Sequence, residues 1–104
     1  MQVTTRGDTL VLDGRLDGRS TALVREHLHA LMRGGCDVVV DLSRVESVDA
    51  TGLGVLAAAG KQLSDDGRRL VLRGAPARLR RVLAFTRVRS LLMVEREGSS
   101  RLAL

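Results

Sequence analysis

The chain has 104 residues, of which 44% are hydrophobic and 28% charged, which is close to the average of soluble globular proteins and unlike disordered or collagen-like chains. This length predicts one domain over residues 1–104, because a second core would have too few side chains to bury. No stretch approaches the roughly 18 consecutive apolar residues of a membrane span, and residues 1–14 lack a signal-peptide core. We therefore expect a cytoplasmic protein with no membrane span.

The charge is strongly basic. Sixteen arginines and one lysine outweigh 12 acidic residues and give a formal net charge of +5, which favours an acidic partner, either a nucleic acid or a protein surface. The densest cluster lies between Arg78 and Arg89. Proteins that bind single-stranded nucleic acid use aromatic side chains for base stacking, whereas Phe85 is the only aromatic residue of this chain. We expect no direct binding of nucleic acid.

Cys36 is the only cysteine, so no disulfide can form within the chain. Its neighbours supply no second ligand at the spacing of a zinc site. We predict that Cys36 is a small residue packed between a helix and a strand, and we expect neither a metal nor another cofactor.

The first third of the chain predicts two strands and a helix. Residues 2–5 and 9–12 alternate in polarity around the turn pair Gly7-Asp8, which is typical of a β-hairpin. Gly34 and Gly35 end a predicted helix over residues 20–33. Its apolar residues fall at i, i+4, i+7 and i+8, as one stripe of an amphipathic helix requires: Val24, Leu28, Leu31 and Met32.

The rest of the chain alternates strands and helices. The β-branched run 38–42 predicts a buried strand at the centre of the sheet, followed by a polar connector over residues 43–50. A second helix extends from there to a stop at residues 65–67. A strand over 70–72, a helix with Pro76 in its first turn and a strand over 91–94 complete the pattern. This alternation predicts an α/β fold.

The start of the second helix carries the chemistry. Asp49 and Thr51 are suited to cap it, and a phosphate on Thr51 would meet the positive end of the helix dipole. Gly52 and Gly54 each lower helix propensity by about 1 kcal/mol, so their presence needs a reason. Close approach of another molecule is one reason, and tight packing of the helix itself is the alternative.

Two motifs here resemble those of STAS-domain anti-sigma factor antagonists. The segment Asp49-Ala50-Thr51-Gly52-Leu53-Gly54-Val55-Leu56 is similar to the family's Asp-Ser-(Ser/Thr)-Gly-Leu-Gly-Val-Leu at a helix start. Upstream, Leu12-Asp13-Gly14-Arg15-Leu16-Asp17 followed by Thr21-Ala22 resembles the family's opening motif. The likeness extends over residues 10–94 and implies a STAS fold, with a central mixed β-sheet of four to five strands and helices packed mainly on one face.

The resemblance also implies a function. In the family, the hydroxyl residue before Gly-Leu-Gly, which is Thr51 here, is phosphorylated by the partner, an anti-sigma factor with serine/threonine kinase activity. The unphosphorylated form binds this partner and releases a sigma factor, and a phosphatase reactivates the modified form. The chain itself would have no catalytic residue. The expected partner-binding residues are Asp17, Asp49, Ala50, Thr51, Gly52, Leu53 and Gly54.

Three departures from the family pattern stand out. Ala50 replaces the usual first serine, Arg15 stands where an acidic residue is common, and residues 85–88 replace a Ser/Thr-Gly-Leu pattern. The tail is also short, so the sequence does not predict the final helix of many relatives. An alternative stays open, in which the chain is a STAS scaffold subunit of a stressosome-like or lipid-transport complex and Thr51 is never phosphorylated.

Overall fold

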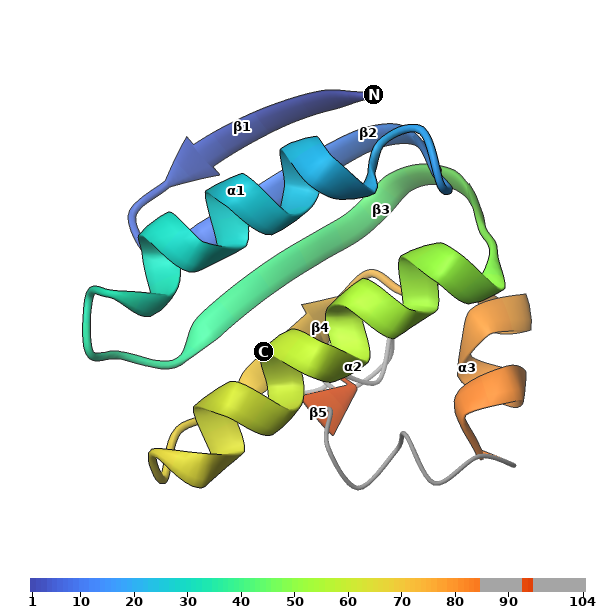
Figure 1. The fold of residues 1–104 in the computed structure, drawn as a ribbon. Coiled ribbons are helices and arrows are strands. Elements are labelled where there is room, and N and C mark those ends of the chain that lie inside the picture. Colours follow the sequence, from blue (N-terminus) through green and yellow to red (C-terminus); the bar gives the residue numbers. More distant parts are fainter. Residues whose placement is uncertain (85–92, 95–104) are drawn as a thin grey trace, which may run out of the picture.

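The computed structural model describes residues 1–84, 93 and 94. Strands and helices alternate after an initial pair of strands, as the sequence predicts (Figure 1). The elements, in chain order, are β1 (Gln2–Arg6), β2 (Thr9–Leu16), α1 (Thr21–Met32), β3 (Val38–Val48), α2 (Ala50–Asp65), β4 (Leu70–Arg73), α3 (Ala77–Ala84) and β5 (Met93–Val94).

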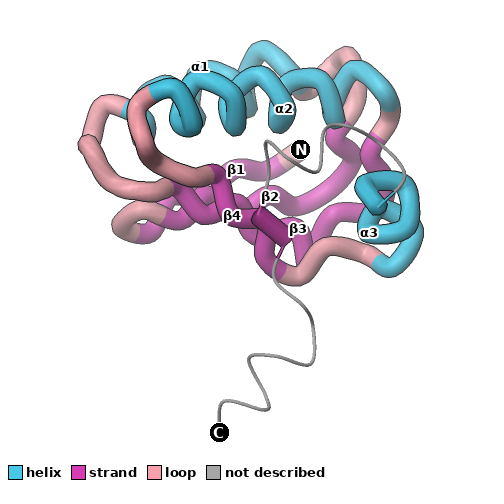
Figure 2. Tube along the Cα trace, turned by 90° about the horizontal axis from the view of Figure 1, so that it is seen from below, coloured by secondary structure: helices cyan, strands magenta, loops and turns pink. Residues whose placement is uncertain are grey.

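The strands form one mixed sheet. Within the described residues its five strands follow the order β1-β2-β3-β4-β5, with β1 antiparallel to β2 and the remaining pairs parallel. Because each crossover moves one strand in the same direction, right-handed connections bring successive helices to the same face. Figure 2 shows α1 and α2 side by side above the sheet. The predicted mixed sheet, with helices mainly on one face, is confirmed.

The core lies between the sheet and these two helices. In β4 every second residue is buried, and in β2 the buried residues Leu10, Leu12 and Leu16 fall on one face, as expected for strands that are covered on one side. The helices contribute the apolar stripes that the spacing predicts. The fully buried side chains include Leu10, Leu12, Leu16, Val24, Leu28, Val38, Leu42, Leu56, Leu63, Leu70 and Leu72.

Strand β3 is longer than predicted. The expected connector after residue 42 is wrong, because β3 continues to Val48 and pairs with β2 as far as the partners Leu16 and Val48. The register between β2 and β3 shifts twice on the way, so that Leu42 and Val45, three residues apart, are both buried. Such irregularities break the two-residue alternation that identifies a strand from sequence.

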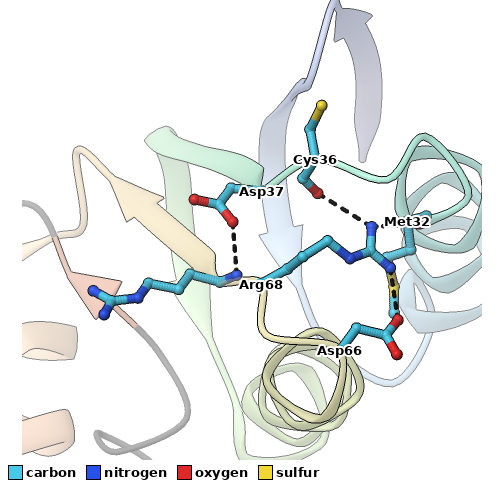
Figure 3. A network of polar contacts seen from close by, with 6 residues as sticks. Met32, Cys36, Asp37, Asp66 and Arg68 are labelled. Carbon is cyan, nitrogen blue, oxygen red and sulfur yellow. Dashed lines mark hydrogen bonds and ion pairs between the residues drawn. The ribbon is translucent and has the colours of Figure 1, made fainter.

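The loop before β3 also differs from expectation. Gly35 has φ +84°, and Cys36 after it is exposed instead of packed between a helix and a strand. Its carbonyl oxygen accepts a hydrogen bond of 3.2 Å from Arg68 Nη1, which also donates to Met32 O at 2.7 Å (Figure 3). Arg68 Nη2 lies 2.9 Å from Asp66 Oδ2. One guanidinium therefore joins the end of α1 to the turn between α2 and β4.

Some predictions fall outside the described residues. Of the predicted strand 91–94, Met93–Val94 is a strand paired with β4, and the other two residues lie outside. So do Phe85, Arg87, Arg89 and the C-terminal residues 95–104. Within the part of the chain that the structure describes, no helix is both long and apolar enough to cross a membrane.

Candidate functional site

The two motifs meet at one edge of the sheet, where β2 and β3 end. Leu16 and Val48 are partners in the parallel ladder, and the Asp49 amide donates to the Leu16 carbonyl oxygen at 3.1 Å. Asp17 and Asp49 each follow these paired residues, so their loops begin at the same edge. In parallel sheets, ligands and partners commonly bind outside the carboxyl ends of the strands.

Asp49 caps α2, as its residue type predicts. Its backbone is extended, and its Oδ1 atom accepts a hydrogen bond of 2.8 Å from the Gly52 amide. The first amides of a helix have no partner within the helix. Those of Ala50 and Thr51 make no hydrogen bond to any other described residue, so the positive end of the helix dipole is open to solvent here.

Thr51 is exposed in the first turn of α2. Its hydroxyl makes no hydrogen bond within the part of the chain that the structure describes. Gly54 is exposed one turn later, and a Cβ atom built there would meet no atom within 4 Å. Residues three apart are neighbours on a helix surface, so Thr51 and Gly54 form an accessible patch.

Gly52 has a different role. It is buried, and a Cβ atom there would overlap the carbonyl oxygen of Leu16 and lie 2.8 Å from Leu16 Cγ. The close approach that glycine permits at this position is therefore between α2 and the end of β2. The hypothesis that glycine is needed for the close approach of another molecule is therefore wrong for Gly52. It is compatible with Gly54, which leaves open space at the surface. A partner contact at Gly52 stays a prediction.

Asp17 shapes the neighbouring loop. It is half-buried, and its Oδ1 atom accepts a hydrogen bond of 3.0 Å from the Arg19 amide. The buried Ser20 hydroxyl accepts from the Asp17 amide at 3.0 Å and donates to the Arg15 carbonyl oxygen at 2.9 Å. Sequence reasoning missed Ser20, although a serine directly before a helix is itself a signal for such local hydrogen bonds. Asp17 as a partner contact stays a prediction.

A hollow of about 410 Å³ opens beside Thr51, between the end of β3 and the starts of α2 and α3. Sequence reasoning placed three of its residues at the site and missed the rest, because the order β3-β4 that brings α3 to this edge is not visible in any local pattern. The lining residues are Glu46, Ser47, Val48, Asp49, Ala50, Leu53, Pro76, Arg78 and Leu79.

Arg15, which stands where an acidic residue is common in the family, forms an ion pair at this site. Arg15 Nε lies 3.4 Å from Glu46 Oε2, and both side chains are exposed. Arg15 of β2 therefore forms an ion pair with Glu46 of β3 close to this edge.

Among residues 1–84, 93 and 94, the side chains of His, Cys, Asp and Glu form no group of three or more that could hold a metal ion. The arrangement offers an exposed hydroxyl, open helix amides and a hollow.

Comparisons with known proteins agree with the motifs. A family model described as "Mlab, STAS domain" matches residues 1–95. The chain is 32% identical to the anti-sigma-B factor antagonist of Bacillus subtilis (strain 168) over 79 residues, which cover 76% of this chain and 72% of that protein.

Solved structures share the fold. The structure of a putative anti-sigma factor antagonist from Thermotoga maritima covers 98% of this chain and 91% of its own, with a TM-score of 0.75 and 22% identity. SpoIIAA, the Bacillus cell fate determinant, is similar in its phosphorylated form, with a TM-score of 0.68, 20% identity and coverage of 98% and 96%. Its unphosphorylated form gives a TM-score of 0.70, 18% identity and coverage of 98% and 93%.

Proposed function

Because this chain belongs to the STAS-domain family of anti-sigma factor antagonists, we propose that its unphosphorylated form binds an anti-sigma factor through the Thr51 edge and so releases a sigma factor. The anti-sigma factor is also the serine/threonine kinase that phosphorylates Thr51, and a phosphatase reverses the modification. The chain is a binding protein and not an enzyme.

The accessibility of Thr51 is the observation that carries this proposal. The side chain is exposed, its hydroxyl has no hydrogen bond to a described residue, and the open amides of Ala50 and Thr51 stabilise nearby negative charge. In the transfer, the Thr51 Oγ1 atom bonds to the γ-phosphorus of ATP and ADP leaves. The hydroxyl proton passes to a base of the kinase. Thr51 can therefore act as acceptor without any opening of the fold.

Phosphorylation changes the affinity through local charge. A phosphothreonine adds about −1.5 to −2 charges two residues from the Asp49 carboxylate. Leaving a charge unpaired in a protein interface costs roughly 2 to 5 kcal/mol, and about 1.4 kcal/mol corresponds to a tenfold change. The affinity for the partner should fall by roughly thirty- to several-thousand-fold.

A large conformational change is unnecessary for this switch. The chain matches the unphosphorylated and phosphorylated forms of SpoIIAA with TM-scores of 0.70 and 0.68 over 98% of its length. One fold thus accommodates both states of that protein. Repulsion and desolvation at the modified residue are sufficient to explain release.

Intact-mass spectrometry after incubation with ATP tests the proposal. The protein is combined with each candidate anti-sigma kinase from its own genome, and binding is measured in parallel. The Thr51→Ala variant removes the acceptor. The Ser64→Ala variant is the matched control, because Ser64 is another exposed hydroxyl residue of α2 and does not line the hollow.

The expected result is one added phosphate on the wild type and on Ser64→Ala, and none on Thr51→Ala. With ATP present, only Thr51→Ala should stay bound to the kinase. Phosphorylation of Thr51→Ala would assign the acceptor to another residue. If no kinase binds or modifies the wild type, the switch is refuted in favour of the scaffold subunit without phosphorylation.

A further inference from the structure

The hollow beside Thr51 has apolar walls and a charged rim. Val48 at the end of β3, Leu53 of α2 and Leu79 of α3 supply apolar side chains from three elements, together with Pro76. Figure 1 shows the start of α3 next to the start of α2. Asp49, Ala50 and Leu53 line the hollow and also belong to the segment around Thr51. A molecule that binds the segment around Thr51 therefore lies next to the hollow.

The charges on the rim differ in what they already contact. Glu46 is paired with Arg15 at 3.4 Å, and Asp49 accepts the Gly52 amide at 2.8 Å. Arg78 is exposed, and no hydrogen bond or ion pair joins it to another residue of the described part of the chain. Arg81, three residues later and also exposed, lies on the same side of α3. Arg78 is therefore the cation on the rim that has no ion pair within the described residues, while Asp49 keeps its negative charge, because the Gly52 amide is a neutral donor.

We infer that the hollow receives an apolar side chain from an acidic segment of the anti-sigma partner, with a carboxylate of that segment pairing with Arg78. This inference rests on the proposed function and names the chemistry of the partner's docking segment. An apolar side chain that fills a pocket at the centre of an interface commonly dominates the binding energy. The carboxylate completes the charge complementarity that sets association rate and specificity.

Two substitutions test the two parts of the inference. Arg78→Glu reverses the rim charge, and its control is Arg6→Glu, the same change at an exposed arginine of the hairpin, at the opposite end of β2. Ala50→Leu places an apolar side chain at the mouth of the hollow. Its control is Ala58→Leu, an exposed position two turns later on α2 that does not line the hollow.

Binding of each variant to the anti-sigma kinase is measured by calorimetry without ATP, so that phosphorylation does not interfere. Arg78→Glu and Ala50→Leu should each weaken binding roughly tenfold or more, while both controls stay within about twofold of the wild type. Arg78→Glu should also regain affinity when an acidic residue in the partner's docking segment is changed to arginine.

Far-UV circular dichroism of every variant shows whether the fold is intact, because Arg78 and Ala50 are exposed and their substitution should not unfold the protein. If the wild type binds and is phosphorylated while Arg78→Glu and Ala50→Leu keep wild-type affinity, the docking inference is overturned and the phosphorylation switch stands. If the wild type binds no kinase at all, both are overturned.

Discussion

Gly52 and Gly54 stand two residues apart in the same motif, and the structure predicts that alanine has opposite effects at the two positions. At Gly52 a Cβ atom would overlap the carbonyl oxygen of Leu16 and lie 2.8 Å from Leu16 Cγ. Leu16 cannot easily move, because it is fully buried and its carbonyl accepts the Asp49 amide at 3.1 Å. The start of α2 must therefore shift away from β2.

The free energy of this shift follows from two opposing terms. Overpacking a well-packed site costs about 1–3 kcal/mol, and contact with a backbone atom places Gly52→Ala near the upper end. The better helix propensity of alanine returns about 1 kcal/mol, so the net loss of unfolding free energy is about 2 kcal/mol. Gly54→Ala meets no atom within 4 Å and keeps only the propensity gain, which stabilises the protein by about 0.5–1 kcal/mol.

Urea unfolding followed by far-UV circular dichroism measures both variants, since the chain has no tryptophan for fluorescence. With m values of about 1–3 kcal/mol/M, the midpoint should fall by about 1 M for Gly52→Ala and rise by a few tenths for Gly54→Ala. A Gly52→Ala protein as stable as the wild type would refute the packing of α2 against Leu16 described above.

Further predictions concern the cap, the guanidinium contacts and a surface ion pair, all measured by the same urea unfolding. Asp49→Ala should lower the free energy of unfolding by about 1 kcal/mol, because the Gly52 amide loses its acceptor. Asp49→Asn should retain most of the stability, because its side-chain oxygen can still cap the helix. Equal losses in the two variants would contradict a stabilising role of the cap. Arg68→Met should lower the free energy of unfolding by about 2 kcal/mol, because two carbonyl oxygens and a carboxylate lose a charged donor. Its control is Arg69→Met, at an exposed neighbour that bonds through its backbone amide, and this change should alter the free energy of unfolding by less than about 0.5 kcal/mol. Similar losses in both variants would contradict the contacts of Figure 3. Lys61→Met should also stay within about 0.5 kcal/mol, since its pair with Asp65 is exposed, and a larger loss would contradict that geometry.

Local sequence patterns predicted most of the elements for an identifiable physical reason. The hairpin turn at Gly7-Asp8, the stripe of α1 and the glycines that end it depend on neighbours within a few residues, and the structure has these elements where the patterns indicated. The cap by Asp49 is equally local. The second half of β3 is the exception, because its register shifts against β2 break the periodicity that would identify this part of the strand from its own sequence.

Cys36 and Gly52 show the same limit at single residues. Cys36 is exposed because Gly35 turns the chain before β3 begins. The direction of that turn cannot be predicted from the composition of the sequence. Gly52 was visible as an unusual residue in a helix start, but its neighbour Leu16 is 36 positions earlier in the chain. Whether such a glycine serves a partner or the core depends on the contact, and only the folded chain makes it.

The sequence by itself determined the α/β class and the two motifs, because these depend on residue type, periodicity and spacing along the chain, and the resemblance of the motifs to the family made Thr51 the candidate acceptor. The tertiary structure decided which features share one edge. Parallel pairing of β2 with β3 joins the two motifs, and the pairing of β3 with β4 brings Arg78 and Leu79 beside Ala50 and Leu53. Strand order is set by long-range hydrogen bonds and buried contacts between distant segments, so no local pattern in the sequence could reveal the hollow.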